Sequence, residues 1–128
     1  MRVLIVDDNT HFLKAAGDLL ERDGMTVVAV ATTGSEALCR VDELQPDVIL
    51  VDVDLGPESG FDLARQIAAA TRAARRPVIL ISASPEQDLV ELIDDSPAIG
   101  FVSKSNLSGQ AISRLLATPQ DGRRSNPG

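Results

Sequence analysis

Short, continuously apolar runs recur along the chain and are separated by segments with helical spacing. The runs are RVLIV at 2–6, TVVAV at 26–30, DVILV at 47–51, PVILI at 77–81 and IGFV at 99–102. They do not alternate between apolar and polar residues, which is typical of strands that are covered on both faces. The pattern therefore predicts five buried strands.

The intervening segments carry apolar residues three and four positions apart, as one face of a helix does. The clearest sets are Phe12, Leu13, Ala16, Leu19 and Leu20; Ala37, Leu38, Val41 and Leu44; and Phe61, Leu63, Ala64, Ile67 and Ala68. Further helices are expected at about Pro85 to Asp95 and from about Leu107 to Ala117. Alternating strands and helices with short connections predict an α/β fold, with a doubly wound parallel sheet whose ligands bind beyond the carboxyl ends of the strands.

Residues 1–117 are expected to form a single domain, because a chain of 128 residues suits one domain with a real core. Residues 118–128 (TPQDGRRSNPG) contain proline, glycine, serine and charge but no apolar face. This segment is expected to be a flexible tail or the start of a linker. The chain is thus either a stand-alone domain or a fragment of a longer protein.

The charge balance narrows the range of partners. A net charge of −7 argues against direct nucleic-acid binding, which needs clustered lysine and arginine. The single cysteine, Cys39, cannot form an internal disulfide, and the chain contains neither a signal peptide nor an apolar run long enough to cross a bilayer. We therefore expect a cytoplasmic protein without membrane contact.

Polar residues follow the apolar runs where the predicted strands end. Asp7 and Asp8 follow the first run, Asp52 and Asp54 the third, Ser82 the fourth, and Ser103 and Lys104 the fifth. In a doubly wound sheet these ends share one crevice. Clustered carboxylates are best neutralised by a hard divalent cation such as Mg²⁺, while a lysine and a hydroxyl suit a phosphoryl group. An aspartate that attacks phosphorus there would form an acyl phosphate.

Four motifs carry this set: VDDN, LVDVDL, ILISAS and GFVSKS. In order and spacing, residues 2 to about 117 resemble the receiver domain of two-component response regulators, in the CheY-like superfamily. The resemblance implies a flavodoxin-like (βα)5 fold, a single five-stranded sheet with the strand order 2-1-3-4-5.

The resemblance also assigns roles at the acidic positions. Asp52 would be the phosphoacceptor and, with the acidic pair, part of the magnesium site. Asp8 would bind Mg²⁺ directly, with Asp7 acting close by or through water. The backbone carbonyl of Asp54 would complete the protein's share of the metal shell.

The remaining motif positions match residues that bind or sense the phosphoryl group. Ser82 would bind a phosphoryl oxygen and Lys104 would neutralise its charge, so these two would act with Asp52 in the transfer. Small Ala83 would leave the approach open. Ser82 and Phe101 match the hydroxyl and aromatic positions that swing inward when receivers are phosphorylated.

The partners implied by the resemblance are a sensor histidine kinase and an output domain or partner protein. The surface around the fourth and fifth strands is expected to bind the output partner or a second copy of the chain. Such a domain assists its own phosphorylation but is not a turnover enzyme.

Other interpretations of these residues remain open. Asp8, with Asn9 and Thr10, is equally suited to cap the first helix. VILVDVDLG also resembles the nucleophile motif of haloacid-dehalogenase-type phosphohydrolases, in which Asp52 would be phosphorylated and Asp54 would act as acid and base. A third alternative is a receiver that is not phosphorylated and only binds other proteins. Finally, Gly56-Pro57 reverses the usual proline-glycine order of receivers, so the loop after Asp52 is expected to trace a different turn.

Overall fold

A computed structural model describes residues 1–70, 76–83 and 97–117. Its strands are β1 (Arg2–Val6), β2 (Thr26–Ala31), β3 (Val48–Asp52), β4 (Asp54–Leu55), β5 (Glu58–Ser59), β6 (Val78–Ser82) and β7 (Gly100–Ser103). Its helices are α1 (Thr10–Arg22), α2 (Gly34–Leu44), α3 (Gly60–Ala70), the short 3₁₀ helix η2 (Lys104–Asn106) and α5 (Gly109–Ala117). The helix expected near residues 85–95 and the tail lie outside the described residues.

Five parallel strands form the central sheet, in the order β2-β1-β3-β6-β7. In chain order, leaving aside the small β4–β5 hairpin, this is the predicted order 2-1-3-4-5. Each expected strand is present within one residue of its predicted bounds. The flavodoxin-like α/β fold is therefore confirmed.

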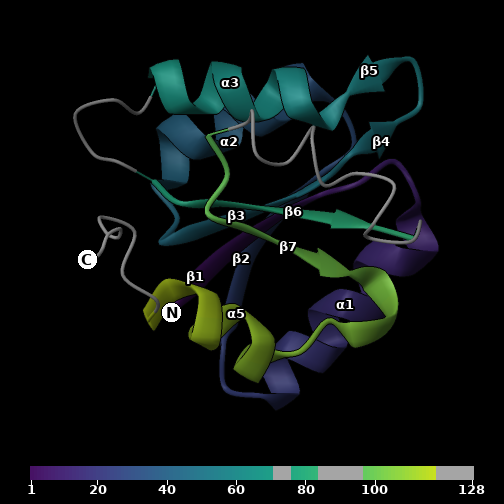
Figure 1. The fold of residues 1–128 in the computed structure, drawn as a ribbon, viewed down its shortest axis with the longest axis vertical. Helices are drawn as coiled ribbons and strands as arrows, with labels where there is room; N and C mark the ends of the chain where they lie inside the picture. The colour runs from purple at the N-terminus through teal and green to yellow at the C-terminus, as the bar shows by residue number, and fades with distance from the viewer. Residues whose placement is uncertain (71–75, 84–96, 118–128) are drawn as a thin grey trace, which may run out of the picture.

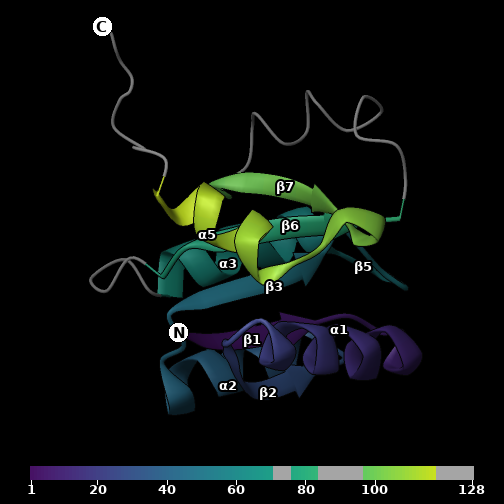
Figure 2. The same cartoon turned by 90° about the horizontal axis from the view of Figure 1, so that it is seen from below.

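Helices cover both faces of the sheet, α1 and α5 on one and α2 and α3 on the other (Figures 1 and 2). Successive residues of a strand point to opposite faces, so each central strand must be apolar at every position. In β1, Val3 and Ile5 pack with α1 and α5, whereas Leu4 and Val6 pack with α2 and α3. This two-sided burial explains why the strands are continuous apolar runs in the sequence.

The last helix begins two residues later than predicted. Leu107 is buried and has an extended backbone, and it ends η2 (φ −65°, ψ 132°). Ser108 then caps α5 by accepting a hydrogen bond from the Ala111 N–H at 3.0 Å. The apolar spacing that suggested a helix from Leu107 thus includes a residue that anchors the preceding turn.

The hairpin of β4 and β5 was not predicted beyond an unusual turn at Gly56-Pro57. These two residues connect the paired strands, and Gly56 has φ +69°. A glycine with positive φ at the first position of a two-residue loop is typical of a type II′ hairpin turn, and a proline suits the negative φ of the second position. The reversed order of glycine and proline therefore has a structural reason.

Candidate functional site

The polar residues at the strand ends line one cavity of about 260 Å³. Its lining is Asp7, Asp8, Asn9, Asp52, Asp54, Gly56, Ser82, Ala83 and Lys104. The cavity lies beyond the carboxyl ends of β1, β3, β6 and β7, where a doubly wound sheet binds its ligands. The structure therefore brings together the predicted acceptor, metal-binding and phosphoryl-binding residues.

Strand register explains this convergence. Val6 of β1 pairs with Val51 of β3, so Asp7 and Asp52, each one residue further on, end adjacent strands at the same level. Ser82 of β6 pairs with Ser103 of β7, and Lys104 follows directly. Apolar pairing along the strands thus fixes the relative positions of the polar residues that follow.

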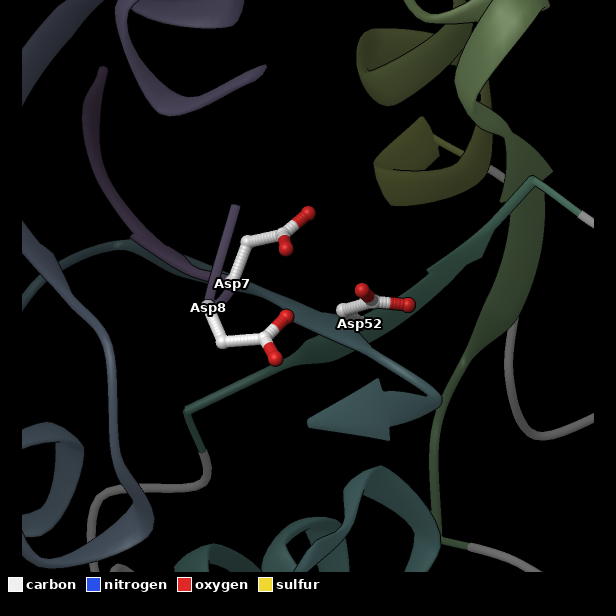
Figure 3. Close-up of side chains that lie close together, drawn as sticks. All are labelled: Asp7, Asp8 and Asp52. Carbon is white, nitrogen blue, oxygen red and sulfur yellow. The ribbon is translucent and has the colours of Figure 1, made fainter. Parts of the chain in front are cut away.

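Asp7, Asp8 and Asp52 form an acidic cluster in which one carboxylate oxygen of each lies within 4.8 Å of the others. Figure 3 shows Asp7 and Asp8 reaching from the end of β1 toward Asp52. Asp7 is fully buried and Asp52 is 5% exposed, whereas Asp8 is exposed at the mouth of the cavity. Three carboxylates so close together repel one another unless a positive charge lies among them.

Lys104 supplies one such charge. Its Nζ lies 2.6 Å from Asp7 Oδ2 and donates a hydrogen bond to Asp52 Oδ2 at 3.2 Å, and its side chain is 17% exposed. Burial lowers the pKa of the ammonium, but the close contact with Asp7, the hydrogen bond to Asp52 and the negative charges of both outweigh burial and raise the pKa above its usual value. Lys104 is therefore charged where it contacts Asp52.

The cluster also fits a metal ion. Asp7 Oδ2 is buried, and among the described residues it finds no hydrogen-bond donor in good geometry, although the ammonium of Lys104 is near. The exposed carboxylate of Asp8 and the buried carboxylates of Asp7 and Asp52 offer the hard oxygen ligands that Mg²⁺ prefers. These donors can hold a divalent cation.

Asp52 has a pKa that is raised from 3.8 to about 6. Burial is the main cause; the N–H of Asp54, which donates to Asp52 Oδ1 at 3.1 Å, opposes it. The charge of Asp7 raises the pKa further and Lys104 lowers it. The charged form of this carboxylate is therefore disfavoured by burial and by the neighbouring negative charge.

The backbone after Asp52 is tightly packed. A Cβ atom on Gly60 would overlap the backbone oxygen of Asp52, so β3 and the start of α3 approach at a distance that only glycine permits. Glu58 of the hairpin accepts a hydrogen bond from the Gly34 N–H, at the start of α2, at 2.9 Å. Both contacts fix the segment that carries Asp54 beside the acceptor.

The cap of α1 is Asn9, not Asp8. Asn9 Oδ1 accepts a hydrogen bond from the Phe12 N–H at 3.1 Å, and the Asn9 N–H donates to Asp7 Oδ1 at 2.9 Å. Asp8 is thus not the residue that caps the helix, and its carboxylate lines the cavity.

Ser82 and Phe101 occupy different environments. Ser82 is 2% exposed and lines the cavity. Phe101 lies on β7, opposite Leu80 of β6, and is partly buried against the core cluster on the α2 and α3 face. Phe101 does not line the cavity, so a role in switching would have to operate through the packing of β6 and β7.

The sequence did not point to three of the residues near the site. Asn9 and Gly56 line the cavity, and Phe12 places its ring 4.4 Å from Lys104 Nζ, measured to the ring centroid. Asn9 directly follows Asp8 and Gly56 lies two residues after Asp54, so their positions in the sequence could have placed them near the site. The contact of Phe12 with a residue 92 positions later along the chain carries no local signal.

Comparison with known proteins identifies the class that this fold and site define. The family model of the response regulator receiver domain matches residues 3–116, and the chain belongs to this family. The match favours the receiver over the phosphohydrolase as the interpretation of VILVDVDLG. In the described part of the chain, no helix has the length and apolar character needed to cross a membrane.

Among curated relatives, the chain is 30% identical to a protein-glutamate methylesterase/protein-glutamine glutaminase of Bacillus subtilis, over 99% of this chain and 38% of that protein. It is 28% identical to the DNA-binding transcriptional activator EvgA of Escherichia coli, over 91% of this chain and 56% of that protein. The chain spans about a third to a half of the length of most of the curated relatives it matches.

Two solved structures are similar over most of this chain. A LuxR-family two-component response regulator from Aurantimonas has a TM-score of 0.80 and 27% identity, over 91% of this chain and 84% of that one. A response regulator from Burkholderia pseudomallei has a TM-score of 0.74 and 25% identity, over 91% of this chain and 66% of that one. The latter structure contains a phosphorylated aspartic acid, a calcium ion and citrate.

The raised pKa of Asp52 predicts that the stability of the metal-free protein depends on pH. Between about pH 4 and pH 6 the folded state binds more protons than the unfolded state, so the free energy of unfolding should fall as the pH rises. Asp52→Asn should remove this fall and stabilise the protein at pH 7 by about 1–3 kcal/mol. Urea unfolding in EDTA at several pH values measures both effects.

The matched control is Asp54→Asn, which removes an exposed carboxylate from the same cavity and should leave the pH dependence in place. An Asp52→Asn protein with the pH dependence of the wild type would show that another group causes it.

Proposed function

We propose that Asp52 accepts a phosphoryl group from the phosphohistidine of a sensor histidine kinase. The observation that carries the proposal is the position of Asp52. Its buried carboxylate ends the central strand β3, lies beside Asp7 and receives a hydrogen bond from Lys104. The phosphorylated aspartic acid in the Burkholderia relative supports the assignment.

In the proposed transfer, a carboxylate oxygen of Asp52 attacks phosphorus and the bond from phosphorus to the histidine nitrogen breaks. The electron pair of that bond stays on the histidine nitrogen, and Asp52 becomes an acyl phosphate. Lys104 provides positive charge for the phosphoryl oxygens, and the Ser82 hydroxyl provides a hydrogen bond. The domain thus acts as a stoichiometric acceptor and not as a turnover enzyme.

We assign the metal site to the carboxylates of Asp7, Asp8 and Asp52, with the backbone carbonyl of Asp54. Mg²⁺ bound there would offset the carboxylate charges and polarise the phosphoryl group. Exposed Asp8 is the accessible ligand, whereas buried Asp7 forms an ion pair with Lys104. The calcium ion in the Burkholderia relative supports a divalent cation in this family.

Phosphorylation is proposed to act on the β6 and β7 side of the sheet. Ser82 is the last paired residue of β6, Lys104 directly follows β7, and Phe101 lies within the paired region. A phosphoryl group that draws Ser82 and Lys104 inward would shift an existing equilibrium of this region. The surface there would then bind an output domain, a partner protein or a second copy of the chain.

Residues 1–117 are proposed to be the receiver, with 118–128 a tail or linker. The curated relatives of this chain include a methylesterase and a DNA-binding activator, of which the chain covers 38% and 56% of the length. The output activity is therefore expected to reside outside the receiver.

The acceptor assignment predicts that one phosphoryl group is incorporated per chain, and only when Asp52 is present. The protein is incubated with Mg²⁺ and acetyl phosphate, and its intact mass is measured. Asp52→Asn should remove the added mass, whereas Asp18→Asn, an exposed change on α1, should retain it. Equal labelling of wild type and Asp52→Asn would contradict the proposal, and sustained hydrolysis of a phosphate ester would favour the phosphohydrolase.

The metal assignment predicts that Asp8→Asn weakens Mg²⁺ binding by about tenfold or more, because the cation loses an accessible carboxylate ligand. Calorimetric titration measures the affinity. Asp18→Asn changes the net charge equally but should leave the affinity near that of the wild type. Unchanged affinity in Asp8→Asn would remove Asp8 from the metal site.

The coupling role of Lys104 predicts that Lys104→Ala still accepts some phosphoryl group but loses the conformational response. The reason is that the ammonium links the new charge to the segment after β7. Amide hydrogen exchange over residues 97–117, before and after labelling, measures the response. Lys14→Ala, an exposed change on α1, is the control. A full response in phosphorylated Lys104→Ala would leave Ser82 as the coupling residue.

A further inference from the structure

Lys104 has a neighbour that differs in kind from the two carboxylates. Its Nζ lies over the ring of Phe12, 4.4 Å from the ring centroid. The face of an aromatic ring carries partial negative charge and attracts a cation within about 6 Å, more strongly when the pair is desolvated. With its side chain only 17% exposed, Lys104 is well placed for a strong contact of this kind.

The ring itself is firmly held. Phe12 lies in the first turn of α1, and its N–H donates to the capping residue Asn9. Its side chain packs against the core cluster on the α1 and α5 face, which includes Leu13 and Leu107. A ring with two side-chain torsions, fixed by a helix and a core, is a rigid surface for the ammonium.

The lysine, in contrast, has a long stem with many rotamers. Its contact with Asp52 is a hydrogen bond of 3.2 Å, longer than its 2.6 Å ion pair with Asp7. With these two contacts alone, the ammonium could move closer to Asp7 and lose its longer hydrogen bond to Asp52. The contact with the Phe12 ring restricts this movement.

We propose that Phe12 is a positioning residue, whose ring holds the Lys104 ammonium beside Asp52 before the phosphodonor arrives. The proposal rests on the proposed function of Asp52 as acceptor. Phe12 acts through Lys104, because its ring contacts the ammonium and it is not among the described residues that line the cavity. Because the ring attracts the charge without accepting a conventional N–H···O bond, the ammonium remains able to donate to incoming phosphoryl oxygens.

A hydrocarbon side chain would fill the same space but would lack the charge on the ring face. Fluorination of the ring separates these two properties, because each fluorine withdraws charge from the face with little change in size. The test therefore replaces Phe12 in the full chain, by site-specific incorporation, with mono-, di- and trifluorinated phenylalanine. The initial rate of Asp52 phosphorylation by acetyl phosphate with Mg²⁺ is measured for each protein.

The rate should fall stepwise along the series, by about three- to tenfold overall. In a Lys104→Ala background the same series should give no trend, because the ring has lost the charge it positions. The matched control is the same series at Phe61, which packs against the core cluster on the opposite face of the sheet and should also give no trend. A flat series at Phe12, or an equal trend without Lys104, would overturn the proposal.

A second measurement tests the contact without any phosphodonor. A ring face close to the ammonium should shift the Lys104 Hε proton resonances upfield, and Phe12→Leu should abolish this shift. Its absence in the wild type would show that the ring does not hold the lysine in solution. If the wild type takes up no phosphoryl group, the proposed function fails and the role of Phe12 fails with it; if it is labelled but the fluorinated series is flat, the role of Phe12 alone is wrong.

Discussion

Repulsion among carboxylates at the end of a buried sheet is the constraint on which the rest of this structure depends. One carboxylate oxygen each of Asp7, Asp8 and Asp52 lies within 4.8 Å of the others, and the apolar pairing of β1 with β3 fixes Asp7 beside Asp52. Burial is the main cause of the raised pKa of Asp52, and the charge of Asp7 adds to it. The Asp54 N–H and Lys104 oppose these effects only in part. In the proposed function, a cation would supply the missing positive charge and a phosphoryl group would engage the lysine.

The scaffold around the cluster keeps this arrangement rigid. Two core clusters cover opposite faces of the sheet and fix β1 and β3 side by side. Gly60 permits the close approach of α3 to the backbone of Asp52. Apolar packing on both faces of the sheet thus holds the buried Asp7 and Asp52 in place, so these two carboxylates cannot reduce their repulsion by moving apart.

Much of this organisation could be predicted from the sequence because it depends on regular periodicity. Continuous apolar runs predict the strands and their burial on both faces. Because ligands of a doubly wound sheet bind beyond the carboxyl ends of its strands, the sequence also predicts that Asp7, Asp52, Ser82 and Lys104 share one crevice. The β4–β5 hairpin was missed, since strands of two residues have no measurable period. The start of α5 was placed too early, because the burial of Leu107 in a turn looks the same in sequence as burial in a helix. The contact between Phe12 and Lys104 depends on the tertiary packing of α1 against the end of β7, which no local pattern encodes.

The hydrogen bond from the Gly34 N–H to Glu58 has a consequence for how such sequences can diverge. A Cβ atom at position 34 would overlap the Glu58 carboxylate, so a larger residue there is compatible only with loss or displacement of the Glu58 side chain. Conversely, loss of Glu58 would leave an N–H at the start of α2 without this acceptor and would release the hairpin that follows the acceptor aspartate. The two positions, 24 residues apart, are therefore coupled through this one hydrogen bond, and a change at either of them removes the same tie between the hairpin and α2.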